Sequence, residues 1–194
     1  MPKLVSGGPS NLPRPTQEEA QALAHDMLHD QGTRWEHVRT AGSVAARLRH
    51  LFELEEAALL VAAATLHDIG YSARVVRTGF HSLDGALFLR AEGYPERLAR
   101  LVAHHSWAVV TAPQNGVHDL EYQFRREDSL LADALVYSDM HSAPSGEFIE
   151  PEARLADIAR RHANPVLHTA RAGMLRASIA RVSSALDDSP PPEE

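Results

Sequence analysis

The sequence contains no cysteine, which excludes disulfides, thiol nucleophiles and metal sites built from thiolates. Lys3 is its only lysine, so the rest of the chain has no Schiff-base or P-loop lysine, and any anion must be bound by the 18 arginines. No long apolar run occurs, and residues 1–15 lack the apolar stretch of a secretory signal. We therefore expect a cytoplasmic protein that does not span a membrane.

The composition favours one helical domain. A chain of 194 residues, 44% of them hydrophobic, is long enough for a single domain with a real core. Alanine and leucine far outnumber valine and isoleucine, which favours helices over strands. The formal net charge of -7 gives no strong indication of a nucleic-acid partner, and the sequence does not indicate an oligomeric state.

The distribution of proline, glycine and charge divides the chain into three parts. We expect a flexible leader at 1–15, a single compact all-α domain of seven or eight helices at 16–186, and an acidic disordered tail at 187–194. Two T-x-x-E capping boxes predict helix starts at Thr16 and Thr33. Helices are expected at about 16–29, 33–51, 54–67, 81–92, 95–106, 129–141, 151–162 and 165–185. The segment 107–128 is loop-rich, and we expect it to border a substrate pocket.

A His-Asp pair ends the most apolar of these helices. Residues 54–67 are apolar on every face after the first turn, which is typical of the buried centre of a helical bundle. His67 and Asp68 close this helix, and Gly70 suits its C-terminal cap. Because the pair sits at the end of a buried helix, it needs a partner that offsets its desolvation.

Further ionisable side chains fall on apolar faces of other predicted helices. Several inward-facing groups from separate helices need a shared partner, and one divalent metal would serve them all. The candidates are His37, His67, Asp68, His81, His104, His105 and Asp139. We expect solvated faces for His25, His29, His118, His141, His162 and His168. His50 lies roughly opposite the inward face that carries His37, and Asp133 points in a different direction from Asp139.

The ordered series of these residues resembles the HD-domain superfamily of metal-dependent phosphohydrolases. Besides His37, the resemblance is carried by LHDIG at 66–70, GFHSLDGA at 79–86, AHHS at 103–106 and SDM at 138–140. It implies an all-α fold of the HD-domain type. It also implies a primary metal site and, in the two-metal branch of the superfamily, a second ion that Asp68 bridges to. The primary ligands would be His37, His67, Asp68 and Asp139, and the second ion would be held by His81, His104 and His105.

The resemblance implies that metal-activated water hydrolyses a phosphate ester, which would be a nucleotide or a related small molecule. His67 and Asp68 would be the catalytic pair. His and carboxylate ligands fit one or two ions of Mn, Fe, Co, Ni or Zn better than Mg or Ca. Tyr71 stands where many catalytic relatives carry a phosphate-facing lysine, so that role would fall to Arg74 or Arg77 or be absent. Tyr71 is a further candidate for substrate binding. Asp84 could orient His81.

Two alternatives to a phosphohydrolase remain open from the sequence. A few HD-fold proteins use a six-ligand di-iron site and O₂ to oxidise a substrate, and all six positions can be filled here. The missing lysine also suits a non-catalytic, metal-stabilised module that senses a nucleotide.

Overall fold

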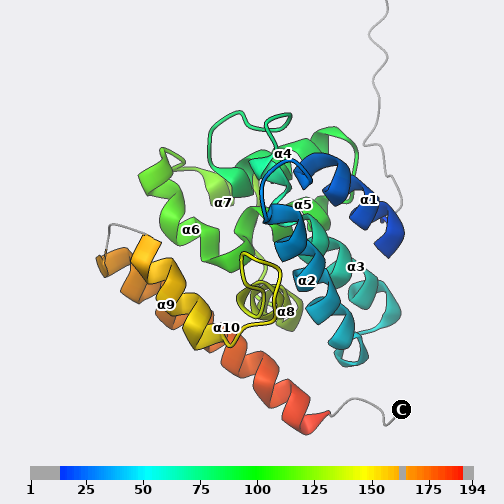
Figure 1. Cartoon of the computed structure of the whole chain (residues 1–194), viewed down its shortest axis with the longest axis vertical. Coiled ribbons are helices and arrows are strands. Elements are labelled where there is room, and N and C mark those ends of the chain that lie inside the picture. Colours follow the sequence, from blue (N-terminus) through cyan, green and yellow to red (C-terminus); the bar gives the residue numbers. More distant parts are fainter. Residues whose placement is uncertain (1–13, 162–164, 190–194) are drawn as a thin grey trace, which may run out of the picture.

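A computed structural model describes residues 14–161 and 165–189, and these residues form an all-α fold (Figure 1). Eight of the described helices have nine or more residues, which confirms the predicted seven or eight. They are α1 (Gln17–Leu28), α2 (Arg34–Arg47), α3 (Leu54–Leu66), α4 (His81–Ala91), α5 (Glu96–His104), α8 (Leu130–Met140), α9 (Pro151–Arg161) and α10 (Pro165–Asp188). The shorter ones are α6 (Ala108–Thr111), α7 (Leu120–Gln123) and the 3₁₀ turns η1 (Arg49–Leu51), η2 (Ile69–Tyr71), η3 (His105–Trp107) and η4 (Ala112–Asn115).

One of the two predicted capping boxes forms. At the start of α1 the Glu19 amide donates to the Thr16 hydroxyl, and the Thr16 amide donates to the Glu19 carboxylate. At the start of α2 the predicted helix start is confirmed, since Thr33 precedes Arg34, but the capping box does not form, because the Thr33 backbone has a ψ of 7° instead of the extended conformation of a capping residue. Its expected partner Glu36 accepts from the guanidinium of Arg39 instead.

The predicted leader and tail fall largely outside the described residues, which exclude 1–13 and 190–194. Where the tail is described, the structure differs from the expectation. Helix α10 continues through Asp187 and Asp188, so the helical part of the chain extends two residues beyond the expected boundary at 186.

Helix α3 is the centre of the bundle, as predicted. It packs against α1, α2, α5 and α8, and its residues from Leu59 to Leu66 are all buried. Because neighbours surround it on every side, its apolar residues need no polar face. Its C-terminal end, where His67 and Asp68 follow, therefore lies in the protein interior.

A second, smaller core lies between α8, α9 and α10. Val136 and Met140 of α8 pack there with Leu155 of α9 and Leu175 of α10. Figure 1 shows α9 and α10 side by side along one side of the molecule, next to α8. This packing fixes α9 and α10 relative to the central helices.

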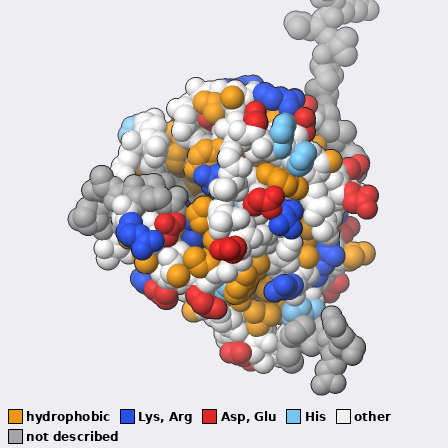
Figure 2. All heavy atoms as spheres, in the orientation of Figure 1, with side chains coloured by type: hydrophobic (Ala, Val, Ile, Leu, Met, Phe, Trp, Pro, Cys, Tyr) orange, Lys and Arg blue, Asp and Glu red, His pale blue; other side chains and the backbone are white. Residues whose placement is uncertain are grey.

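None of the described helices is both long and apolar enough to cross a bilayer. On the face shown in Figure 2, basic and acidic side chains of the described residues are interspersed.

Candidate metal site

A close backbone approach brings the His-Asp pair next to α4. Gly70 lies so near the first turn of α4 that an added Cβ would stand 1.9 Å from the carbonyl oxygen of His81. Glycine is therefore needed here because no side chain fits, rather than as the predicted helix cap. The contact holds Asp68 beside His81, which comes from the next helix.

The Asp68 carboxylate lies between two groups of imidazoles. Its Oδ2 is 3.7 Å from Nε2 of His37 and 3.6 Å from Nε2 of His67. Its Oδ1 is 3.5 Å from Nε2 of His81 and 3.6 Å from Nε2 of His105. One carboxylate thus faces two half-sites, one on each oxygen.

Asp139 completes the half-site on the Oδ2 side. Its Oδ1 is 3.1 Å from Nε2 of His37 and 3.7 Å from Nε2 of His67. Its other oxygen accepts a hydrogen bond from the Ser106 hydroxyl. On the Oδ1 side of Asp68, the Nε2 atoms of His81 and His105 are 3.2 Å apart.

Backbone carbonyls fix three of the four rings. Nδ1 of His37 lies 3.2 Å from the carbonyl oxygen of Ala143, and Nδ1 of His67 lies 2.8 Å from that of Ala64. His105 is held in the same way, since its Nδ1 is 2.6 Å from the carbonyl oxygen of Val102. A carbonyl can only accept, so each Nδ1 carries a proton and Nε2 is the ring atom that faces the cluster.

Burial sets the protonation states that metal ligands need. It lowers the pKa of His67 to about 4 and that of His81 to about 3, so both rings are neutral near pH 7. Burial alone would raise the pKa of Asp68, but His67 and Arg34 hold it well below its usual value. The pKa of Asp139 is likewise lowered, against the effect of burial, by His37 and His67. Neutral imidazoles and charged carboxylates bind divalent metals.

These donors fit a divalent transition metal. Ligands about 2.0–2.2 Å from an ion stand roughly 3.0–3.5 Å apart in octahedral or tetrahedral arrangements, close to the 3.1–3.7 Å seen here. The sets His37, His67, Asp139 and His67, Asp68, His105 each bring their ligand atoms within 4.8 Å of one another. Nε2 of His67 is buried without a hydrogen-bond partner among the described residues, as expected of an atom reserved for a metal.

The comparisons with known proteins agree with this geometry. A family model described as HD domain matches residues 34–167, well over half of the chain. The chain belongs to the HD domain family. Neither the comparison with curated proteins nor that with solved structures finds a significant match. Within this HD domain lie all four ligands that the resemblance implied for the primary metal, and the structure brings them together.

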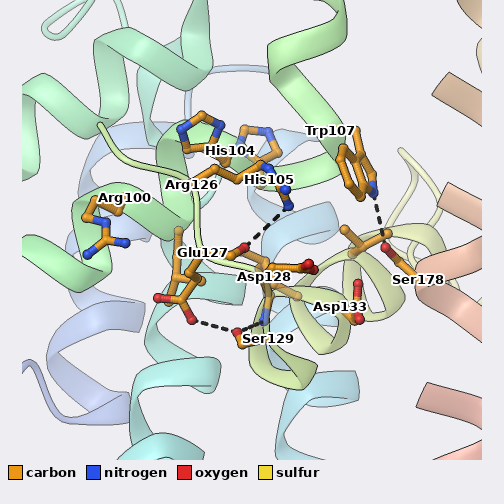
Figure 3. Close-up of a pocket in the computed structure, with 14 residues that line it drawn as sticks. Arg100, His104, His105, Trp107, Arg126, Glu127, Asp128, Ser129, Asp133 and Ser178 are labelled. Atoms are coloured by element: carbon orange, nitrogen blue, oxygen red, sulfur yellow. Dashed lines mark hydrogen bonds between the residues drawn. The ribbon is translucent and has the colours of Figure 1, made fainter. Parts of the chain in front are cut away.

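The structure brings His105 into the cluster but not its neighbour His104. Nε2 of His104 lies 2.5 Å from the carbonyl oxygen of Phe124, which turns the ring away from Asp68. The two side chains diverge because α5 ends at His104 and the backbone changes direction at His105. His104 instead lines a separate pocket of about 30 Å³, room for a water molecule rather than a substrate (Figure 3).

A larger cavity of about 460 Å³ opens on the cluster and is lined by Asp68, His81, His105 and Asp139. Tyr71 also lines it and stacks on His81, with 4.1 Å between ring centroids. Arg34, Arg154 and Arg171 supply its positive charge. The structure thus places the expected Tyr71 at the cavity, together with three arginines that the sequence analysis did not single out.

The arginines that were expected there lie elsewhere. Arg74 forms an exposed ion pair with Asp26, 2.6 Å away on α1. Arg77 is exposed, and its backbone amide donates to Asp84. Asp84 does not orient His81 as expected, because both its oxygens accept from the 77–79 loop. The loop after η2 turns outward, and Asp84 holds it in that position.

The remaining histidines mostly lie where the sequence suggested. His25, His29 and His118 are exposed, as predicted. His141 was expected on the surface, but it is buried and packs against Tyr137. His162 and the side chain of His168 lie outside the described residues.

A turn with unusual backbone angles joins the His and Asp cluster to α10. Ser106 and Trp107 have φ values of 50 and 57, a region that residues other than glycine rarely adopt. The Ser106 hydroxyl donates to Asp139, and its carbonyl accepts from Nε of Arg171 at 2.7 Å. The Trp107 indole donates to the hydroxyl of Ser178 at 3.1 Å (Figure 3). The turn therefore links Asp139 of the cluster, a cavity arginine and α10.

Proposed function

We propose that this HD domain is a metal-dependent phosphohydrolase that cleaves a phosphate ester of a small molecule. The observation that carries this proposal is the cavity of about 460 Å³ beside the cluster, whose wall combines the carboxylates of Asp68 and Asp139 with three arginines. Arginine binds phosphate oxygens through paired N–H donors, and metal ions withdraw charge from the same group. Metal ligands and anion-binding groups in one cavity are what phosphoryl transfer to water requires.

The ligands divide between two ions. His37, His67, Asp139 and Oδ2 of Asp68 would hold one, while His81, His105 and Oδ1 of Asp68 would hold a second. When bound, such ions supply Lewis-acid stabilisation of phosphoryl oxygens and lower the pKa of water to about 7. The imidazole and carboxylate donors favour Mn, Fe, Co, Ni or Zn.

The residues of the chain prepare this site for an anionic substrate. Nη1 of Arg34 donates to Oδ2 of Asp68 at 2.6 Å, and so opposes part of the negative charge in the cluster. Stacking against Tyr71 restricts the His81 ring, which is the most exposed of the four imidazoles. Both contacts limit reorganisation when substrate arrives.

The proposal is tested by metal analysis of the purified protein, followed by phosphate-release assays over a panel of phosphate esters with Mn, Co, Ni, Fe and Zn. We expect bound transition metal and phosphate release that a chelator abolishes. Oxygen uptake by an iron-loaded, EPR-active mixed-valence form would instead favour the oxygenase alternative. Stabilisation by nucleotides with no release from any ester would favour the sensing module.

Thermal melting gives a second reading of the same site. Metal bound only by the folded state adds about 2.7 kcal/mol at a hundredfold excess over Kd. Chelation should therefore lower the Tm by roughly 5–11 °C for a chain of this size. His25→Ala, which changes an exposed imidazole, should retain this shift, and His67→Ala should lose it. Equal shifts in the two variants would contradict the assignment of His67 to the metal.

A further inference from the structure

The cavity beside the cluster has a buried base and an exposed mouth. Asp68, Asp139 and Arg154 are all buried and mark the base. Gln114 and Asn115 of η4 also line the cavity but are exposed, so they mark its mouth. A substrate that fills the cavity therefore has one end at the metal ligands and the other near solvent.

All three cavity arginines contact residues at the buried end of the cavity, either directly or through Ser106. Arg34 donates to Asp68 at 2.6 Å, and Nη2 of Arg154 lies 3.8 Å from Oδ1 of Asp139. Arg171 donates to the Ser106 carbonyl, and the hydroxyl of Ser106 in turn donates to Asp139. The positive charge of the cavity is thus concentrated around the two carboxylates.

Arg154 has unused donors although it is only 7% exposed. Its Nε is buried and has no hydrogen-bond partner among the described residues. Its Nη atoms lie 3.4 Å from Asp157 and 3.8 Å from Asp139, longer than the roughly 2.7–2.9 Å of a strong charge-assisted hydrogen bond. A buried guanidinium is seldom left in this state, so an anion is the partner that would satisfy it.

The rest of the described cavity wall carries no charge. It is made of uncharged polar side chains and apolar side chains, and the described lining residues include neither a further arginine nor a further carboxylate. These uncharged residues include Ala108, Thr111, Gln114, Asn115, Ile158 and Leu167. A second or third phosphate group extending away from the base would therefore meet no charged side chain among the described lining residues.

From this distribution of charge we infer that the substrate is a phosphate monoester of an uncharged organic alcohol, with its terminal phosphate bound by Arg154 and Arg171. This inference rests on the proposed function. A monoester carries about two negative charges on three terminal oxygens, enough to engage several guanidiniums and metal ions at the base. A diester carries one charge on two such oxygens and would leave donors unfilled. The uncharged alcohol portion matches the neutral wall.

The reaction balances without a further reactant. The oxygen of water forms a bond to phosphorus, and the bond between phosphorus and the alcohol oxygen breaks. One water proton ends on the released alcohol, and the other stays on inorganic phosphate. The arginines stay protonated throughout and hold the phosphoryl oxygens in place.

The class of substrate is tested with the metal-loaded full chain on 4-nitrophenyl phosphate and bis(4-nitrophenyl) phosphate, which share a leaving group. We expect kcat/KM to favour the monoester by about 10²-fold or more, and a nucleoside monophosphate to be a better substrate than its triphosphate. Preference for the diester or the triphosphate would overturn the inference and leave the phosphohydrolase proposal standing. No turnover of any ester would overturn both.

Variants of Arg154 test its role in binding the terminal phosphate. Arg154→Gln should lower kcat/KM for the monoester by about 10²-fold and change that for the diester much less. Arg160→Gln alters an exposed arginine on the same helix and should change neither. An equal loss for both esters in Arg154→Gln, or no loss, would contradict the assignment.

Binding of inorganic phosphate to the metal-loaded protein, followed by calorimetry, gives a reading that is independent of turnover. Both Arg154→Gln and Arg171→Gln should weaken phosphate binding by at least about tenfold while the metal content stays unchanged. If Arg154→Gln folds poorly, Arg171→Gln still tests whether the arginines bind phosphate. Unchanged phosphate affinity in a folded variant would overturn the inference.

Discussion

The two oxygens of Asp68 face half-sites that are built differently. On the Oδ2 side, His37, His67 and Asp139 are all buried and complete a set of four candidate ligands. On the Oδ1 side there are only His81 and His105, and the His81 side chain is 25% exposed. Closed ligand sets hold a metal firmly, whereas sets with open positions leave room for water and substrate. We therefore expect a tighter ion on the Oδ2 side and a weaker, more accessible one on the Oδ1 side.

The largest effect should come from the residue that both half-sites share. Asp68→Asn removes the negative charge that faces both ions, so we expect loss of both and a fall in phosphate release. Several kcal/mol of transition-state stabilisation by metal corresponds to at least about 10³-fold in kcat. Elemental analysis and phosphate-release rates measure this. Asp133→Asn, which changes a buried carboxylate paired with Arg181 outside the cluster, should keep its metal. Retention of both ions by Asp68→Asn would contradict the bridging role.

Separate changes to the two half-sites should affect different ions. His37→Ala removes a ligand from the buried set, and we expect it to weaken the tighter ion by more than about 100-fold and to lower the Tm of the metal-loaded protein. His81→Ala should leave the tighter ion bound and reduce the metal content by one ion. Titration with Mn²⁺ distinguishes the two results. If both variants lose the same ion, the two half-sites are one site.

The two neighbouring histidines at the end of α5 give a finer test of the Oδ1 side. His105 faces Asp68, whereas His104 contacts the carbonyl of Phe124. His105→Ala should weaken the second ion by about 100-fold, and His104→Ala should leave both metal affinities unchanged. The same Mn²⁺ titration measures both variants. A weakened second ion in His104→Ala would show that the ring reaches the cluster.

These half-sites show how far the sequence alone could go. Periodicity places His37 and Asp139 on inward faces, and the apolar helix before His67 and Asp68 predicts their burial, because helix geometry and hydrophobicity are both written in local sequence. The structure agrees on these points. The choice between His104 and His105 depends on where α5 ends, and helix ends are the part of a helix that local sequence fixes least.

The arginines of the cavity were harder to predict for a different reason. Arg34, Arg154 and Arg171 come from α2, α9 and α10, and no spacing along the chain relates them. They meet because α9 and α10 pack on α8 through apolar contacts between residues that are distant in sequence from α2. Arg74 and Arg77 are near His67 and Asp68 in sequence, but their loop turns outward. One available signal was the scarcity of lysine, which assigns anion binding to arginine without saying which arginine.

The smallest expected effect concerns the residue that holds Asp139 in place. Ser106→Ala removes the hydroxyl that donates to the second oxygen of Asp139, so the carboxylate can turn away from His37 and His67. We expect the tighter ion to bind about tenfold more weakly, the lower end of what such supporting residues contribute. Ser106→Gly also lacks the hydroxyl, but glycine adopts a φ of 50° without steric cost. The free energy of unfolding of Ser106→Gly should therefore be about 1 kcal/mol higher than that of Ser106→Ala. Metal titration and denaturant unfolding separate the two effects. If Ser106→Gly binds metal as tightly as the natural sequence, the hydroxyl does not position Asp139 and only the backbone conformation matters.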